Sequence, residues 1–142
     1  MIKEILKVKD WGRIINLALL ILRVGIAILM LQHGLPKLGK LIDGNFNFSD
    51  PIGLGSTVSL ILTVFAEFLC SILIAVGLGT RLASIPLIIT MVVIIFIVHG
   101  SDPVFAHYNV LFYLIGYILL LITGSGKYSL DYYLQKRNHP AR

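Results

Sequence analysis

Charged side chains are scarce in this chain of 142 residues. Lys, Arg, Asp and Glu make up 13% of it, well below the roughly 25% of an average soluble domain. Hydrophobic residues make up 57%, and a soluble chain of this length cannot bury that much apolar surface. The composition therefore argues against a soluble domain and favours a single integral membrane domain over residues 1–142.

Cysteine is almost absent as well. The one cysteine, Cys70, lies within an apolar run, so no internal disulfide can form. The chain also has no C-x-x-C pair and no Cys/His spacing typical of zinc sites. This excludes a thiol oxidase that by itself passes electrons from paired cysteines to a quinone. We interpret Cys70 as a small core residue and predict no metal site.

Long apolar runs account for most of the chain. They cover about 14–35, 57–78, 82–99 and 108–123. A bilayer core of about 30 Å needs about 20 helical residues, and these runs lack the alternation of membrane β-strands. The sequence thus predicts an all-α fold, an integral membrane four-helix bundle with a polar outer loop at 37–56. We expect the first run to be retained as a helix rather than cleaved as a signal peptide.

Basic residues are distributed unequally between the two sides of these spans. Lys37 and Lys40 lie on the side of the outer loop, and Arg23 lies inside the first span. The opposite side holds the remaining nine: Lys3, Lys7, Lys9, Arg13, Arg81, Lys127, Lys136, Arg137 and Arg142. Because cytoplasmic segments are enriched in Lys and Arg, both termini are predicted to be cytoplasmic. The net charge of +5 follows from this topology, and nucleic acid is not expected as a partner.

Two ionisable residues, Arg23 and Glu67, lie deep within the first two spans. Helical rise places them about 13 Å and 16 Å from the cytoplasmic edge. A charge at the centre of a membrane helix costs about 2.5–3.5 kcal/mol on insertion scales, so we expect the two residues to form an ion pair. That pair either fixes the register of the helices or lines a polar cavity in which both residues are catalytic.

A polar stripe continues from Arg23 to the outer surface. If the helix continues past Pro36, helical spacing places Gly34 and Lys37 on the face of Arg23, with His33 beside them. The stripe predicts a pocket that opens outwards.

Histidines gather at the same outer surface. His99 leaves the third span there, and neutral imidazole can hydrogen-bond a quinone carbonyl. His33, Lys37 and His99 are therefore the candidate ligand-binding residues. His107 and Asp102, in a short turn, are expected only to face water.

Three stretches resemble the DoxX/DoxD family of small four-helix membrane proteins. They are LRVGIAILMLQHGLPKL (22–38), AEFLCSILIAVGLGTRLAS (66–84) and GSGKYSLD (124–131), and the likeness extends over about 16–134. The resemblance implies a four-helix bundle in a prokaryotic inner membrane. Some members are subunits of thiosulfate:quinone oxidoreductase, and others are linked to membrane redox complexes, oxidative-stress systems or the maturation of exported proteins. Many members carry a second carboxylate near the start of the fourth span, where this chain has Tyr108 and Asn109.

Two functions agree with these observations. The first is a membrane redox-associated subunit whose pocket binds a quinone, the candidate cofactor, or a small sulfur or oxygen species. A partner protein would supply the electrons, and any enzymatic activity would be that of an oxidoreductase acting with this partner. The alternative is a non-enzymatic membrane chaperone or assembly scaffold that uses the outer loop as its contact surface. Self-association is left open. The pocket residues of the first function are Glu67, Arg23, His33, Lys37 and His99.

Overall fold

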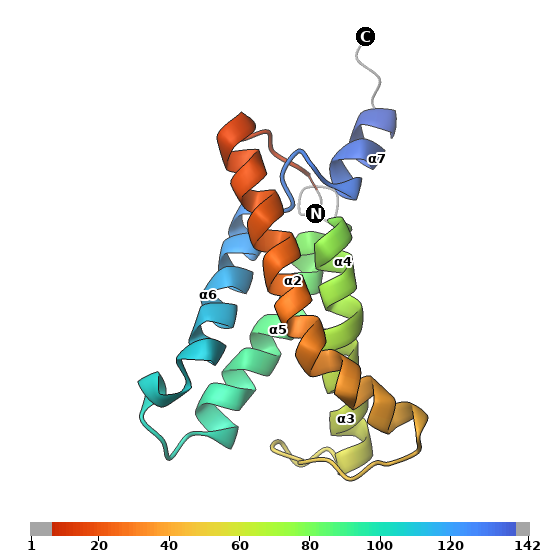
Figure 1. The fold of residues 1–142 in the computed structure, drawn as a ribbon, viewed down its shortest axis with the longest axis vertical. Helices are drawn as coiled ribbons and strands as arrows, with labels where there is room; N and C mark the ends of the chain where they lie inside the picture. The colour runs from red at the N-terminus through yellow and green to blue at the C-terminus, as the bar shows by residue number, and fades with distance from the viewer. Residues whose placement is uncertain (1–6, 139–142) are drawn as a thin grey trace.

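Helices form all the regular structure in residues 7–138, the part of the chain that this computed structural model describes. The body contains α2 (Arg13–Ile42), two further long runs over Ser56–Val76 and Thr80–Val98, and α6 (Tyr108–Thr123) (Figure 1). The first three are long and apolar enough to cross a membrane, whereas α6 has 16 residues. The all-α class and a multi-pass membrane protein are thus supported. That α6 is a fourth span stays a prediction.

The two middle runs each contain a π-helical segment. Ser56–Val76 consists of α3 (Ser56–Val64), the π-helix η1 (Phe65–Cys70) and α4 (Ser71–Val76). Thr80–Val98 consists of α5 (Thr80–Val93) and the π-helix η2 (Ile94–Val98). Short π-helical turns inside α-helices are frequent at functional sites. The side chains of both segments are therefore candidates for a functional role.

The first helix is longer than the apolar run that predicts it. It continues through Pro36 to Ile42, so the condition for the polar stripe is met. Its 30 residues extend about 45 Å, more than the thickness of a bilayer core. The connecting loop is therefore shorter than the predicted 37–56 and covers residues 43–55. Hydropathy predicted the end of the apolar run at residue 35, whereas the helix itself ends at Ile42.

The two ends of the molecule differ in their connections. The start of α2 and α7 (Leu130–Asn138) lie at one end, and the loops 43–55 and 99–107 lie at the other (Figure 1). At the first end, the Val8 amide donates to Gln135 Oε1 at 2.8 Å. That the first end is cytoplasmic stays a prediction.

The apolar core lies where α2 packs against the second run and where α5 and α6 complete the bundle. Its buried side chains include Ala27, Met30, Cys70, Ile74, Leu87, Met91, Tyr117 and Leu120. The prediction that Cys70 is a core residue is confirmed. Large apolar side chains also cover much of the outer face, which favours a lipid environment; they include Ile14, Ile21, Ile89, Phe96, Phe112 and Ile122.

Gly34 sets the distance between α2 and the second run. A Cβ at this position would lie 2.8 Å from the backbone carbon and oxygen of Glu67 and 2.9 Å from the amide nitrogen of Phe68. Backbone at such a distance cannot move aside without shifting the whole helix. The residue at position 34 must therefore lack a side chain for α2 to pack directly on η1.

The substitution Gly34→Ala is expected to force α2 away from η1. We expect a loss of about 1–3 kcal/mol of stability, the usual cost of overpacking a core, seen as a lower melting temperature in detergent. Gly39→Ala is the control, because a Cβ on Gly39 meets no atom within 4 Å. Equal melting temperatures for the two variants would contradict this packing.

Candidate functional site

Glu67 lies in η1 and is 1% exposed. Its carboxylate accepts hydrogen bonds from Lys37 Nζ, at 2.6 Å to Oε1 and 2.5 Å to Oε2. Lys37 lies three residues beyond Gly34, so the close approach of α2 to η1 also brings this ammonium to the carboxylate. A buried carboxylate is costly unless it is paired. Lys37, whose side chain is 26% exposed, supplies the positive charge that pairs with it.

Arg23 is held by the segment that follows α6. Its side chain is buried, with 2% exposed. Nη1 donates to the carbonyl oxygen of Ser125 at 3.2 Å, and Nη2 donates to that of Tyr128. Asp131 adds a nearby negative charge. The guanidinium therefore fastens residues 124–129 to α2.

Two glycine-rich turns meet around this guanidinium. A Cβ on Gly77, which has φ +74°, would collide with Arg23. The Asp131 amide donates to Gly77 O at 3.0 Å, and Asp131 Oδ1 accepts from the Gly79 amide at 2.9 Å. Asp131 therefore joins the turns after α4 and α6, which the sequence placed on one side of the membrane, and Arg23 lies against both of them.

The predicted Arg23–Glu67 ion pair is therefore wrong, because each residue binds a different partner. Arg23 precedes Lys37 by fourteen residues, or about 21 Å along α2. The sequence-based depths assumed that each apolar run starts at the membrane edge. The chain after α6 instead folds back against α2, so Arg23 lies level with the turns at that end.

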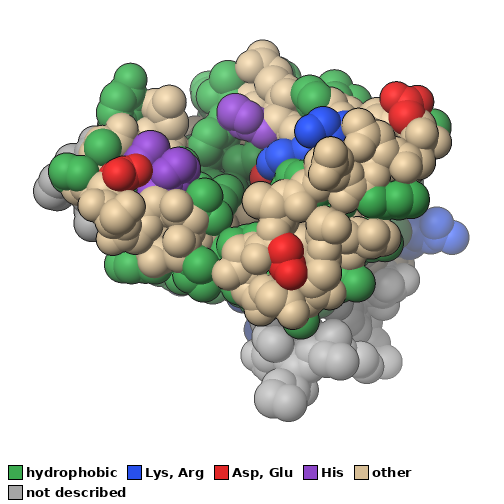
Figure 2. Space-filling model, turned by 90° about the horizontal axis from the view of Figure 1, so that it is seen from below, with side chains coloured by type: hydrophobic (Ala, Val, Ile, Leu, Met, Phe, Trp, Pro, Cys, Tyr) green, Lys and Arg blue, Asp and Glu red, His purple; other side chains and the backbone are tan. Residues whose placement is uncertain are grey.

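A groove of about 630 Å³ runs between α2 and α6. These helices diverge towards the end that holds the loops 43–55 and 99–107 (Figure 1). Viewed from that end, the surface is hollowed, with Lys and His side chains beside the hollow (Figure 2). Most of the lining is apolar, and the polar members His33, Asn109 and Tyr113 come from the diverging ends; the lining is Ile21, Leu22, Gly25, Ile26, Leu29, His33, Asn109, Phe112, Tyr113 and Gly116.

Aromatic residues connect this groove with the buried ion pair. The His33 and Tyr113 rings meet edge to face with centroids 6.0 Å apart, and Tyr113 stacks on Tyr117 at 6.3 Å. The carboxylate of Glu67 interacts electrostatically with both tyrosines. A line of three aromatic rings, those of His33, Tyr113 and Tyr117, thus leads from the groove into the core.

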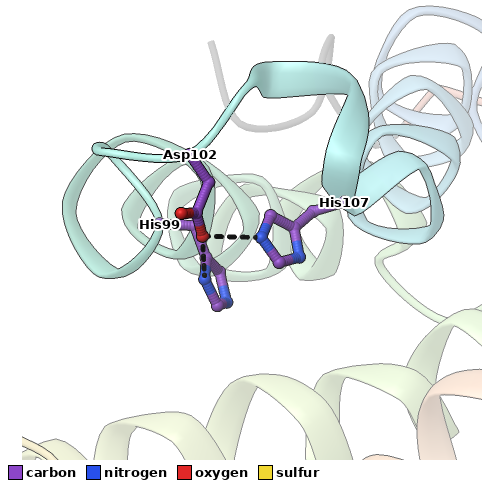
Figure 3. A group of neighbouring side chains, drawn as sticks. All are labelled: His99, Asp102 and His107. Atoms are coloured by element: carbon purple, nitrogen blue, oxygen red, sulfur yellow. Dashed lines mark hydrogen bonds and ion pairs between the residues drawn. The ribbon is translucent and has the colours of Figure 1, made fainter.

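His99 belongs to a different cluster. His107 Nε2 lies 3.1 Å from Asp102 Oδ2, and His99 Nδ1 lies 3.4 Å from the same oxygen (Figure 3). The two imidazole rings stack with centroids 3.7 Å apart. Hydrogen bonds from His107 and His99 hold the pKa of the Asp102 carboxyl below its usual range. The side chains predicted only to face water therefore bind one another.

The five predicted site residues do not form one pocket. Lys37 and Glu67 are paired, His33 lines the groove, Arg23 binds the C-terminal segment and His99 binds Asp102. Their catalytic and ligand-binding roles stay predictions.

Sequence reasoning missed three residues at or near the groove. Tyr113 and Asn109 line it, and Tyr117 is buried behind Tyr113. The sequence does show tyrosines at positions 108, 113 and 117, but this pattern is also typical of aromatic residues at a membrane interface. The contact of Tyr113 with His33 on α2 shows that Tyr113 belongs to the groove.

The fold and these sites together define a multi-pass helical membrane protein with a buried ion pair and an open groove. A family model for DoxX matches residues 18–100, more than half of the chain, and the chain belongs to the DoxX family. The predicted resemblance is confirmed, and the match indicates a membrane family associated with redox systems. Searches among curated proteins and among solved structures gave no match.

A double-mutant cycle can show that Glu67 is paired with Lys37 and not with Arg23. Lys37→Met leaves the Glu67 carboxylate buried and unpaired, and we expect a loss of about 2–3 kcal/mol, less than the 3–5 of a fully buried pair because Lys37 is partly exposed. Adding Glu67→Leu removes that carboxylate, so the double variant should lose less stability than the sum of the single variants.

The control cycle combines Arg23→Met with Glu67→Leu. We expect additive losses in this cycle, because the two residues have separate partners. Both cycles are measured by unfolding in the same detergent. A larger coupling energy for Arg23 and Glu67 than for Lys37 and Glu67 would contradict the assignment of the ion pairs.

Proposed function

We propose that the protein is the membrane subunit of a redox system and that it binds a quinone in the groove between α2 and α6. One observation carries this proposal: the groove is long and apolar and ends in three polar side chains, those of His33, Asn109 and Tyr113. A quinone has the matching construction, with a polar ring at one end of an apolar tail.

The chemistry of the polar end suits a quinone ring. Quinone carbonyls accept hydrogen bonds, and imidazole, phenol and carboxamide groups can each donate one. His33, Tyr113 and Asn109 would therefore orient the ring, while the tail would lie along Leu22 and Leu29.

The size of the groove favours the same ligand. Its volume of about 630 Å³ falls in the usual range for small-molecule sites. A small sulfur anion would fill little of this space and would meet a mainly apolar wall. We therefore prefer a quinone to a small sulfur or oxygen species.

The reaction requires electrons from elsewhere. Reduction of a quinone to a quinol takes two electrons and two protons, and the chain has a single thiol, Cys70, which is buried. A redox partner protein would supply both electrons and would itself be oxidised. The protons come from water at the polar end, through His33 and Tyr113.

Buried charges would support this site indirectly. Lys37 and Glu67 hold α2, which carries His33, against η1. Arg23, bound to the backbone of residues 124–129, would act as a structural residue rather than a catalytic one.

The unequal distribution of Lys and Arg between the two ends of the molecule predicts which side of the membrane the groove faces. The end that holds the loops 43–55 and 99–107 is poor in Lys and Arg. By the positive-inside rule it faces away from the cytoplasm. The polar end of the groove would then open at the outer side of the cytoplasmic membrane.

A scaffold remains the second candidate because of the loop 43–55. This loop exposes Phe46, Ile52 and Leu54 yet is ordered by Asp50, whose carboxylate accepts from the amides of Leu54 at 2.9 Å and Gly55 at 2.8 Å. An ordered loop with exposed apolar side chains is suited to contact another protein. In that case shortening the loop would abolish partner capture and leave bound quinone unchanged.

The substitution Gly25→Leu is expected to fill the groove without harming the fold. A Cβ on Gly25 meets no atom within 4 Å, although Gly25 lines the groove. We expect the variant to retain at most about a tenth of the quinone bound to the wild type, since the new side chain occupies the place of the tail. Bound quinone is measured by native mass spectrometry after gentle release from the cell's own membrane.

Gly39→Leu is the matched control, because Gly39 lies on the same helix outside the groove and is equally open. It should keep wild-type quinone. His33→Leu should weaken binding with no change in melting temperature, since His33 is exposed. Equal quinone in Gly25→Leu, Gly39→Leu and wild type would rule out this groove as the site.

A further inference from the structure

The cluster of His99, Asp102 and His107 has no role in the quinone site. Its members each offer one ligand atom, and these atoms all lie within 4.8 Å of one another. The three residues lie within a segment of nine positions, in the pattern His-x-x-Asp-x-x-x-x-His. They lie at the outer connection between η2 and α6.

Local backbone structure holds each member in place. The His99 amide donates to Ile94 O at 3.0 Å at the end of η2, and the Asp102 amide donates to His99 O at 3.0 Å in the turn that follows. His107 ends the 3-10 helix η3 (Val104–His107) and directly precedes α6. His99 and His107 therefore lie at the ends of helical segments, and Asp102 lies in the hydrogen-bonded turn between them.

We propose that His99, Asp102 and His107 form a binding site for a divalent transition-metal ion of the Zn²⁺ class. Tetrahedral zinc binds nitrogen and oxygen at about 2.0–2.1 Å, which places neighbouring ligand atoms about 3.3 Å apart. The distances of 3.1 Å and 3.4 Å from Asp102 Oδ2 to the two imidazole nitrogens are close to this value. The two imidazole rings stack with centroids 3.7 Å apart, so binding would require them to turn until both nitrogens face the ion.

The donor set selects the type of metal. Two imidazole nitrogens and one carboxylate suit zinc and its neighbours in the first transition row, whereas magnesium and calcium prefer oxygen ligands throughout. The three side chains are 34%, 48% and 31% exposed. Water can therefore reach the ion and fill the fourth position.

The ion would bridge the ends of two successive helical segments, η2 and α6. His99 follows η2, and His107 precedes α6. A bound ion would fix the connecting turn at the rim of the hollow, where Figure 2 shows His side chains next to an acidic one. This proposal does not depend on the quinone site.

Cobalt titration tests the site directly. The full chain is purified in detergent with an affinity tag that lacks histidine and is then titrated with Co²⁺, a spectroscopic substitute for Zn²⁺. We expect one Co²⁺ per chain with the strong visible absorption of tetrahedral cobalt, and loss of this absorption when Zn²⁺ is added. His107→Ala and Asp102→Ala should each weaken binding by at least about tenfold.

His33→Ala is the matched control, since it removes a histidine from the same end of the molecule but outside the cluster. It should bind Co²⁺ as the wild type does. Absence of stoichiometric Co²⁺ from the wild type would overturn the proposal, as would equal affinity in His107→Ala, Asp102→Ala and wild type. That outcome would leave only a hydrogen-bonded cluster.

A second measurement needs no variant. Hydrogen exchange of the wild-type protein is compared with and without Zn²⁺. Slower exchange confined to residues 99–108 is expected, because the ion fixes this turn. Unchanged exchange there at a saturating Zn²⁺ concentration would overturn the proposal even if the variants failed to fold.

Discussion

The buried carboxylate of Glu67 is the constraint on which the middle of the structure depends. A charge placed between apolar helices must be paired, and Lys37 reaches it only because Gly34 allows α2 to lie directly on the backbone of η1. One glycine, one lysine and one π-helical turn thus form a single unit. At the end of the molecule where α2 begins, Arg23 holds the C-terminal segment against α2 by binding its carbonyl groups.

These two anchors explain where the groove lies. α2 is held against the second run by the Lys37–Glu67 pair and against residues 124–129 by Arg23. It is therefore free to diverge from α6 at the end away from Arg23 (Figure 1). His33 on α2 and Tyr113 on α6 line the space between these two helices. The buried ion pair and the proposed quinone site are in this way parts of one arrangement.

The sequence predicted the helical class, the family and the stripe on α2 because these follow from composition and helical spacing. It also identified Glu67, Lys37 and His33 as notable residues. It assigned the wrong partner to Glu67, since a count of residues along separate spans cannot reveal that the segment after α6 folds back onto Arg23. The pairing of His99 with Asp102 and His107 depends on the conformation of one turn, and residue spacing alone does not determine that conformation.

A photoreactive quinone analogue can show whether a quinone binds between α2 and α6. The analogue is activated on the wild-type protein in its own membrane, and the labelled peptides are identified by mass spectrometry. We expect labels within residues 21–33 and 109–116, the segments that line the groove, and we expect these labels to be lost when natural quinone is added in excess. Labels confined to other segments, or labels that excess quinone does not reduce, would contradict a quinone site between α2 and α6.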